Sequence, residues 1–273
     1  MRRERGRRTS SGDMFTIAGP VILDLNTQRD LLLADGAGAV FQAEKLHDPL
    51  RKLFLFAQRN EVPVISTRFD HLLTPGRSSG MPGTRNAIEG SPGKLICLPT
   101  AAGYQKMPFT TLRKRREWAL DCGTDLPVDG FRSTQQYVFD LPSLNPFECP
   151  RLDRLLSEST VEAFLIAGVP LEWTVRTAVL GLLARRHKVV MVSDCLGMWD
   201  PYEGDMALRQ VESKNVEWLT VEQVGERFSQ AARLRATRAA CAAARAQRRM
   251  ATAPPVSPKM PMKTAKGRGA FRV

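Results

Sequence analysis

Three polar segments each follow an apolar stretch of the chain, which is where the functional residues of an α/β protein are found. They are 23–30 (LDLNTQRD), 68–71 (RFDH) and 168–178 (GVPLEWTVRTA). Each segment leaves a predicted strand, and ligands of parallel α/β sheets bind at the carboxyl ends of the strands. The sequence therefore predicts one site built from all three segments.

Asp24 and Thr174 are the side chains whose positions suggest a reaction. Asp24 lies near the end of a buried strand, where a carboxylate is costly unless it is paired or used. Thr174 falls in the first turn of a predicted helix, where free N–H groups and the helix dipole stabilise an anion. A cysteine there would be an activated thiolate, with Asp24 as proton acceptor and the amides as an oxyanion hole. The pattern is that of a nucleophile pocket without its nucleophile.

The elements that must position these residues alternate along the chain. Hydrophobic periodicity predicts strands at 15–23, 62–67, 136–139, 161–167, 188–193 and 217–219. It predicts helices at 43–59, 113–119, 151–157, 172–186, 207–216 and 221–228. The alternation indicates an α/β fold with three layers, a Rossmann-like and mainly parallel sheet with helices on both faces. Residues 72–134 are rich in Gly and Pro, and we expect few regular elements there.

Composition favours one globular domain with two basic extensions. We expect a disordered arm at 1–13, a domain at 14–228 and an Ala-, Arg- and Pro-rich tail at 229–273 that is first partly helical and then disordered. No run approaches the ~18 apolar residues of a membrane span. The five cysteines are scattered and odd in number, which favours a reducing, cytoplasmic location.

The formal net charge of +12 arises in the extensions, because residues 14–230 carry a net charge of −2. A basic tail binds polyanions by releasing counterions. This tail has Phe271 as its only aromatic residue and contains no nucleic-acid-binding motif. We therefore expect a solvated tail with weak polyanion binding at most.

Two motifs resemble those of the isochorismatase-like hydrolases, a family that includes the nicotinamidases. Segment 21–33 (VILDLNTQRDLLL) resembles the family's opening motif, in the branch with a D-x-x-T-Q-x-D-F pattern. Segment 165–200 is similar to its G-V-x-x-E-x-C-V-x-x-x-A-x-x-L motif and the V-x-x-V-x-D-A strand that follows. The resemblance covers roughly 15–227 and implies the three-layer fold, self-association and hydrolysis of small amides or of isochorismate. We expect neither a cofactor nor a metal.

The resemblance also implies a triad of Asp, Lys and Cys. Asp24 matches the Asp, and Thr174 stands where the Cys would be. The Lys is expected near Asp140 or Leu141, where there is none, and Lys106 lies in a segment (GYQKMP) that resembles a different part of the family pattern. On this interpretation two of the three catalytic groups are absent.

The resemblance places a cis peptide next to the oxyanion hole, at Val169–Pro170. Proline lowers the cost of a cis bond to about 1 kcal/mol, so we predict that this bond is cis. The expected pocket residues besides Asp24 and Thr174 are Gln28, His71, Val169, Pro170 and Trp173.

Three functions remain open at this stage. The first is a catalytically impaired member of the family that keeps a small-molecule pocket. The second is an active hydrolase that activates water through Asp24 or recruits Cys122 or Cys149. The third is a nucleic-acid-associated protein that acts through its tails. Asp24 could equally serve as a structural acid, and Asp70-His71 is a weak metal signal because a lone His rarely binds zinc.

Overall fold

The computed structural model of this chain describes residues 15–69, 96–121, 123–229 and 234. Predictions made for His71, Cys122, the arm at 1–13 and almost all of the tail lie outside these residues. The chain divides into two units, Met1–Gln230 and Ala231–Val273.

The first unit is built on a seven-stranded sheet in the order β3-β4-β2-β1-β5-β6-β7, and every neighbouring pair is parallel. The strands are β1 (Thr16–Leu25), β2 (Val64–Phe69), β3 (Arg115–Trp118), β4 (Gln136–Leu141), β5 (Thr160–Gly168), β6 (Val189–Leu196) and β7 (Glu217–Leu219). From β1 the chain moves to one side through β2 and to the other through β5. The carboxyl ends of β1 and β5 therefore form the switch point where ligands of such sheets bind.

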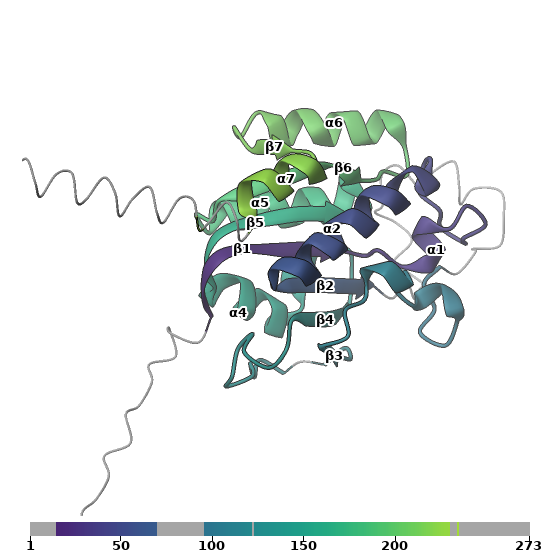
Figure 1. Ribbon diagram of the computed structural model, residues 1–273. Coiled ribbons are helices and arrows are strands. Elements are labelled where there is room, and N and C mark those ends of the chain that lie inside the picture. The colour runs from purple at the N-terminus through teal and green to yellow at the C-terminus, as the bar shows by residue number, and fades with distance from the viewer. Residues whose placement is uncertain (1–14, 70–95, 122, 230–233, 235–273) are drawn as a thin grey trace, which may run out of the picture. The chain divides into compact units, whose positions relative to one another are not determined.

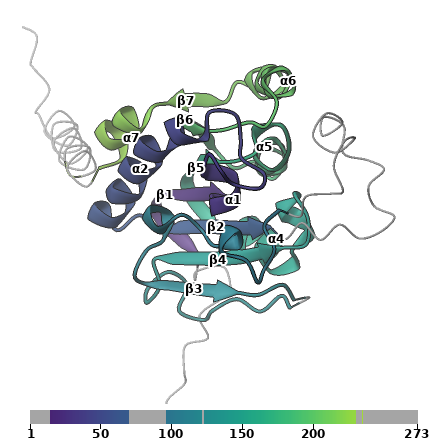
Figure 2. The same cartoon turned by 90° about the vertical axis from the view of Figure 1, so that its right-hand side faces the viewer.

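Helices cover both faces of the sheet (Figures 1 and 2). In Figure 2, α2 and α7 lie on one side of the strands and α4, α5 and α6 on the other. The helices are α1 (Arg29–Leu32), α2 (His47–Asn60), α4 (Pro150–Glu158), α5 (Arg176–Ala184), α6 (Pro201–Glu212) and α7 (Val221–Phe228). Shorter turns are η2 (Ala43–Leu46), η3 (Ala102–Tyr104), η4 (Pro108–Thr110), η5 (Pro146–Glu148) and the π-helical η6 (Leu171–Val175). The predicted α/β class and the helices on both faces are thus confirmed.

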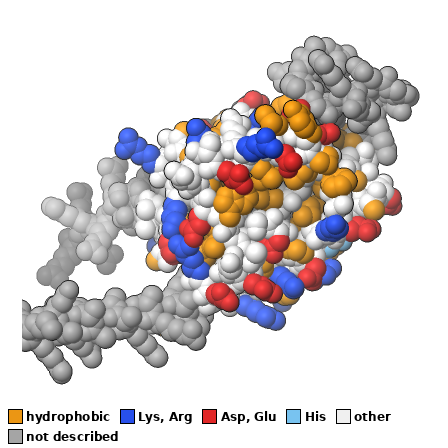
Figure 3. All heavy atoms as spheres, turned by 90° about the horizontal axis from the view of Figure 1, so that it is seen from above, with side chains coloured by type: hydrophobic (Ala, Val, Ile, Leu, Met, Phe, Trp, Pro, Cys, Tyr) orange, Lys and Arg blue, Asp and Glu red, His pale blue; other side chains and the backbone are white. Residues whose placement is uncertain are grey.

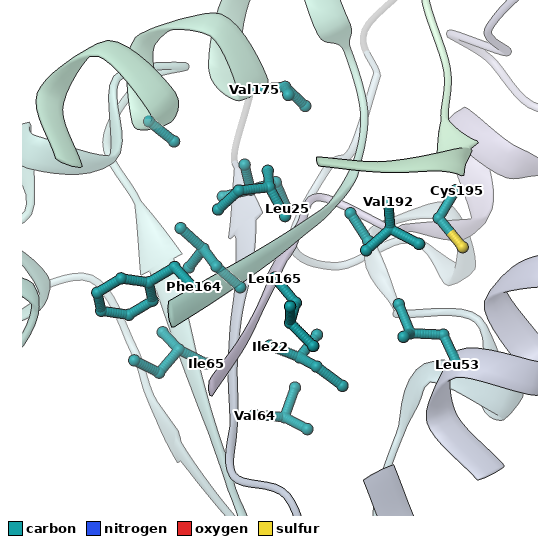
Figure 4. Packing of buried hydrophobic residues seen from close by; sticks show 14 of the residues in the cluster. Ile22, Leu25, Leu53, Val64, Ile65, Phe164, Leu165, Val175, Val192 and Cys195 are labelled. Carbon is teal, nitrogen blue, oxygen red and sulfur yellow. The ribbon is translucent and has the colours of Figure 1, made fainter. Parts of the chain in front are cut away.

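The core lies between the sheet and these helices, and the apolar runs of the central strands explain it. The central strands are buried on both faces, so β1 and β5 are almost continuously apolar rather than alternating. Figure 4 shows Leu53 of α2 beside Val192 and Cys195 of β6. Fully burying one such aliphatic side chain contributes about 1.5–3 kcal/mol, so the sheet and α2 stabilise each other.

The segment predicted as a helix at 113–119 is the edge strand β3, and that prediction was wrong. Trp118 stacks on Phe139 of β4, with ring centroids 4.9 Å apart and planes 19° apart. Glu117 reaches the opposite face of the strand and pairs with Arg68 of β2 at 2.9 Å. These long-range contacts fix an extended backbone that local propensity alone does not specify.

The segment predicted as one helix at 172–186 is two elements, the π-helical turn η6 followed by α5. Single π-turns widen a helix locally and are frequent at functional sites. The next helix, α6, begins at Pro201 instead of the expected residue 207, because Asp200 caps it by accepting hydrogen bonds from the N–H groups of Tyr202 and Glu203.

The turn from β5 into η6 is held very close to β1. Gly168 has φ +123°, and a Cβ on it would lie 2.0 Å from the carbonyl oxygen of Leu25. The next residue, Val169, donates its N–H to the same carbonyl at 2.8 Å. The Val169–Pro170 bond, for which we expected the cis form, is cis. Only glycine suits this position, because it alone tolerates both the backbone angle and the contact.

The surface of this unit is apolar in some places and charged in others. Figure 3 shows apolar side chains gathered among acidic and basic ones on the face that carries α6, where Tyr202 and Met206 are exposed. At the other edge of the sheet, β3 exposes charged side chains instead. Among the described residues, no helix is long and apolar enough to cross a membrane.

We predict that Gly168→Ala destabilises the protein by at least about 3 kcal/mol, because it adds backbone strain of about 1–3 kcal/mol to a backbone clash. The matched control is Gly225→Ala in α7, where an added Cβ would meet nothing within 4 Å. The control should stabilise the helix by roughly 0.5–1 kcal/mol. Urea unfolding of both variants checks this, and equal effects would refute the close approach of β5 to β1.

Candidate functional site

Asp24 lies at the carboxyl end of β1 and is fully buried. Its Oδ1 accepts a hydrogen bond from the Thr27 hydroxyl at 2.8 Å, and its Oδ2 accepts one from the Ser66 hydroxyl at 2.7 Å. Ser66 is the residue of β2 in register with Asp24. The sheet register itself thus supplies one of the donors that stabilise the carboxylate.

Lys106 completes this arrangement, and it overturns the expectation that no lysine accompanies Asp24. Its Nζ lies 2.7 Å from Asp24 Oδ2 and 2.8 Å from the hydroxyl oxygen of Thr27, to which it donates. The lysine side chain is 4% exposed. Burial lowers the pKa of Lys106, and Asp24 opposes that shift by favouring the charged form.

The position of Lys106 explains why the sequence pattern missed it. It lies between η3 and η4, in the Gly- and Pro-rich stretch where no strand was predicted. A short antiparallel bridge between Lys106 and Gln28 brings this stretch alongside the segment that follows β1. A signal was available, because a lysine set between the apolar pair Met107-Pro108 and the aromatic Tyr104 is positioned for burial and then needs a carboxylate partner.

Thr174 lies in η6 and is fully buried. The Asn26 side chain donates from Nδ2 to the Thr174 hydroxyl oxygen at 3.0 Å. Asn26 has a left-handed backbone, with φ +51°, and is fixed by Thr67, whose hydroxyl donates to Asn26 Oδ1 at 2.6 Å and accepts from the Asn26 N–H at 3.1 Å. Asp24 and Thr174 therefore belong to one buried polar cluster at the switch point, joined through the 24–27 segment.

Gln28 was expected to line a pocket, but its amide is engaged within the protein. Its Nε2 donates to the carbonyl oxygens of Phe69 and Tyr104, and its Oε1 accepts from the N–H of Phe69. Gln28 therefore ties the end of β2 to η3, the turn before Lys106. This makes Gln28 a residue that positions the cluster.

The other expected pocket residues lie around η6. Val169 and Pro170 are buried at its start, and Trp173 is half-buried, with the guanidinium carbon of Arg176 5.9 Å from its ring centroid. Cys149, one of two cysteines considered as a recruited nucleophile, is buried, and burial raises the pKa of its thiol. A raised thiol pKa is the opposite of activation.

Glu172 also belongs to this region, and its role was not anticipated. Its Oε1 accepts from the N–H groups of Trp199 and Asp200 at 2.7 and 3.1 Å, while its Oε2 is buried and has no hydrogen-bond partner among the described residues. Burial raises the pKa of this carboxyl group. Glu172 thus fastens the turn that carries Thr174 to the segment leading into α6.

Sequence comparison gives the family. The family model for the isochorismatase domain matches residues 20–223, which is most of the chain. The chain belongs to the isochorismatase family. No curated protein sequence matches it significantly.

Solved structures share the fold of this isochorismatase-family chain at low sequence identity. A cysteine hydrolase from Pseudomonas syringae pv. phaseolicola is 16% identical, with a TM-score of 0.55, over 76% of this chain and 91% of that one. A pyrazinamidase of Pyrococcus horikoshii in complex with zinc is 17% identical, with a TM-score of 0.53, over 74% and 98%. A pyrazinamidase/nicotinamidase from Streptococcus mutans is 12% identical, with a TM-score of 0.53, over 74% and 100%. At these identities the likeness establishes the fold alone.

We predict that Asp24→Asn and Lys106→Met each destabilise the protein by about 3–5 kcal/mol, because each leaves a buried group without its partner. The double variant should lose clearly less stability than the sum of the losses in the two single variants. Denaturant unfolding of the four proteins measures this coupling. Additive losses would show that the two side chains do not interact.

We predict a pH-dependent effect of Glu172→Gln. A carboxyl group whose pKa is raised in the folded protein above its ordinary value of 4.5 reduces stability as the pH climbs through the interval between the two values. The variant lacks this loss, so its free energy of unfolding relative to the wild type should increase from pH 4.5 to pH 7. Glu226→Gln, on the exposed side of α7, controls for removal of a charge. A constant difference for Glu172→Gln across this range would contradict the raised pKa.

Proposed function

We propose that this isochorismatase-family protein has lost covalent amide hydrolysis and retains a site for a small polar molecule at the carboxyl ends of β1, β2 and β5. The observation that carries the proposal is the environment of Thr174. Its hydroxyl contacts the carboxamide of Asn26, a neutral group that cannot remove a proton. An alcohol is a far weaker nucleophile than a thiolate and needs a general base in hydrogen-bond contact.

The second support is that the carboxylate oxygens of Asp24 are already engaged in contacts within the protein. Both carboxylate oxygens already accept hydrogen bonds, and one of them is also paired with the lysine ammonium. Asp24 then acts in the resting protein as the counter-ion of Lys106. A carbonyl or carboxylate oxygen of a small molecule would replace the long contact of Lys106 Nζ with the Thr67 carbonyl oxygen (3.4 Å), since charge-assisted hydrogen bonds are the strong ones.

One observation favours a second candidate, hydrolysis without a protein nucleophile. Because Lys106 does accompany Asp24, two of the three groups that the family resemblance implies are in contact. In such a reaction Asp24 would take a proton from water, the hydroxide would add to the substrate carbonyl, and the proton would pass to the leaving amine. Lys106 would stabilise the charge that develops on the carbonyl oxygen.

Turnover assays with nicotinamide and pyrazinamide distinguish the two candidates. We expect the wild type to show no hydrolysis above that of Asp24→Asn. The hydrolysis rate of Thr174→Cys should exceed this background at least tenfold, because a thiol needs a much weaker base than an alcohol. Thr174→Ser is the matched control and should gain nothing.

Wild-type hydrolysis that disappears in Asp24→Asn, while circular dichroism shows this variant to be folded, would contradict the first candidate and establish the second. If Thr174→Cys folds and remains inactive, the idea that Asp24 and Lys106 are still competent partners for a nucleophile at position 174 is wrong.

A further inference from the structure

The longest run of consecutive basic residues in the described part of the chain is Arg113-Lys114-Arg115-Arg116, which leads into the edge strand β3 at Arg115. All four are exposed. They lie at the end of the sheet, because β3 pairs with β4 alone. This run was not part of the sequence-based case for polyanion binding, which rested on the tail.

Most of this charge is not neutralised by the described residues. Arg115 pairs with Glu117 at 2.7 Å, and the same glutamate also receives Arg68. Arg113 and Lys114 form no ion pair with any residue that the structure describes. The body of the protein, residues 14–230, has a net charge of −2, so this run is a local excess of positive charge.

Two guanidinium groups, that of Arg116 within the run and that of Arg132 outside it, contribute to the positive surface. Arg116 lies over the ring of Trp118, 5.0 Å from its centroid, and Trp118 is itself stacked against β4. A cation held over an aromatic ring is partly ordered before any partner arrives. Arg132 is exposed near the same place, since Arg132 and Arg116 both act on Asp129, whose pKa is lowered mainly by the hydroxyl of Ser133. Asp129 offsets one of these charges.

The chemistry of these side chains suits phosphate groups. Guanidinium groups bind phosphate oxygens through charge-assisted, often bidentate hydrogen bonds. Exposed basic residues that are near neighbours in the chain, such as Arg113, Lys114 and Arg116, can therefore bind neighbouring phosphates of one strand. Pairing with another protein strand is disfavoured, because β3 is four residues long and charged edges of this kind resist strand addition.

We propose that Arg113, Lys114, Arg116 and Arg132, which we call the basic edge, bind the sugar–phosphate backbone of nucleic acid without selecting bases. The ring of Trp118 is already packed against β4 and covered by guanidinium groups, so the proposal assigns no base stacking to it. Binding is electrostatic and falls steeply with salt.

The test is fluorescence anisotropy of the full chain with a labelled 20-nucleotide oligouridylate, from 50 to 200 mM NaCl. The triple variant Arg113→Ala/Lys114→Ala/Arg116→Ala should weaken binding at least tenfold at 100 mM salt. It should also reduce the slope of log affinity against log salt by about 2, since each phosphate contact on a single strand contributes ~0.7. The charge-preserving variant Arg113→Lys/Arg116→Lys should bind within a few fold of the wild type.

The matched control is Arg245→Ala/Arg248→Ala/Arg249→Ala, which removes the same charge from the tail. An equal loss of affinity in both triple variants would contradict the proposal, because it would show that only the net charge of the protein matters. Absence of oligonucleotide binding by the wild type at 50 mM salt would also overturn it. Binding to phosphatidylserine vesicles that needs the same residues, without oligonucleotide binding, would assign the surface to membranes and refute the proposal. Circular dichroism melting confirms that each variant is folded.

Discussion

A fully buried carboxylate is stable only if its surroundings replace the water it has lost, and Asp24 is surrounded in this way. An ammonium group and two hydroxyls reach its two oxygens. Their origins show how much of the fold this interaction requires. Ser66 comes from the neighbouring strand in register, Thr27 from the segment just after β1, and Lys106 from an irregular stretch beyond η3. The ion pair therefore exists only when the sheet, the 24–28 segment and that stretch are all in place.

Two sets of contacts shape the site around this pair. Asp24 and Lys106 supply the electrostatic part, a charged pair in a medium of low dielectric constant. The turn at Gly168 and Pro170 supplies the geometric part, because it places the start of η6 against the end of β1. At position 174, within η6, the side chain is a secondary alcohol that accepts a hydrogen bond from a neutral amide.

Much of the fold could be predicted from the sequence, because its signals are local. The apolar runs of β1, β2, β5 and β6 and the spacing in α2 are visible in short windows, and the predicted bounds of β7 and α7 match those observed. Asp24 and Thr174 were placed correctly at strand and helix ends. The edge strand β3 and Lys106 could not be predicted in this way. Both lie in the Gly- and Pro-rich region, where conformation is set by contacts with distant residues such as Phe139 and Gln28, and no periodicity records such contacts.

The bridge between Gln28 and Lys106 has a consequence for the order of folding. Thr27 and Lys106 are 79 positions apart in the chain, so their contact closes a long loop, and the entropy lost on closure is recovered only after the surrounding strands have assembled. The contacts among β1, α2 and β2 are of shorter range, as between Ile22 and Val64, and do not need this loop. The charged centre of the molecule is thus expected to close late, on a scaffold that has already excluded water.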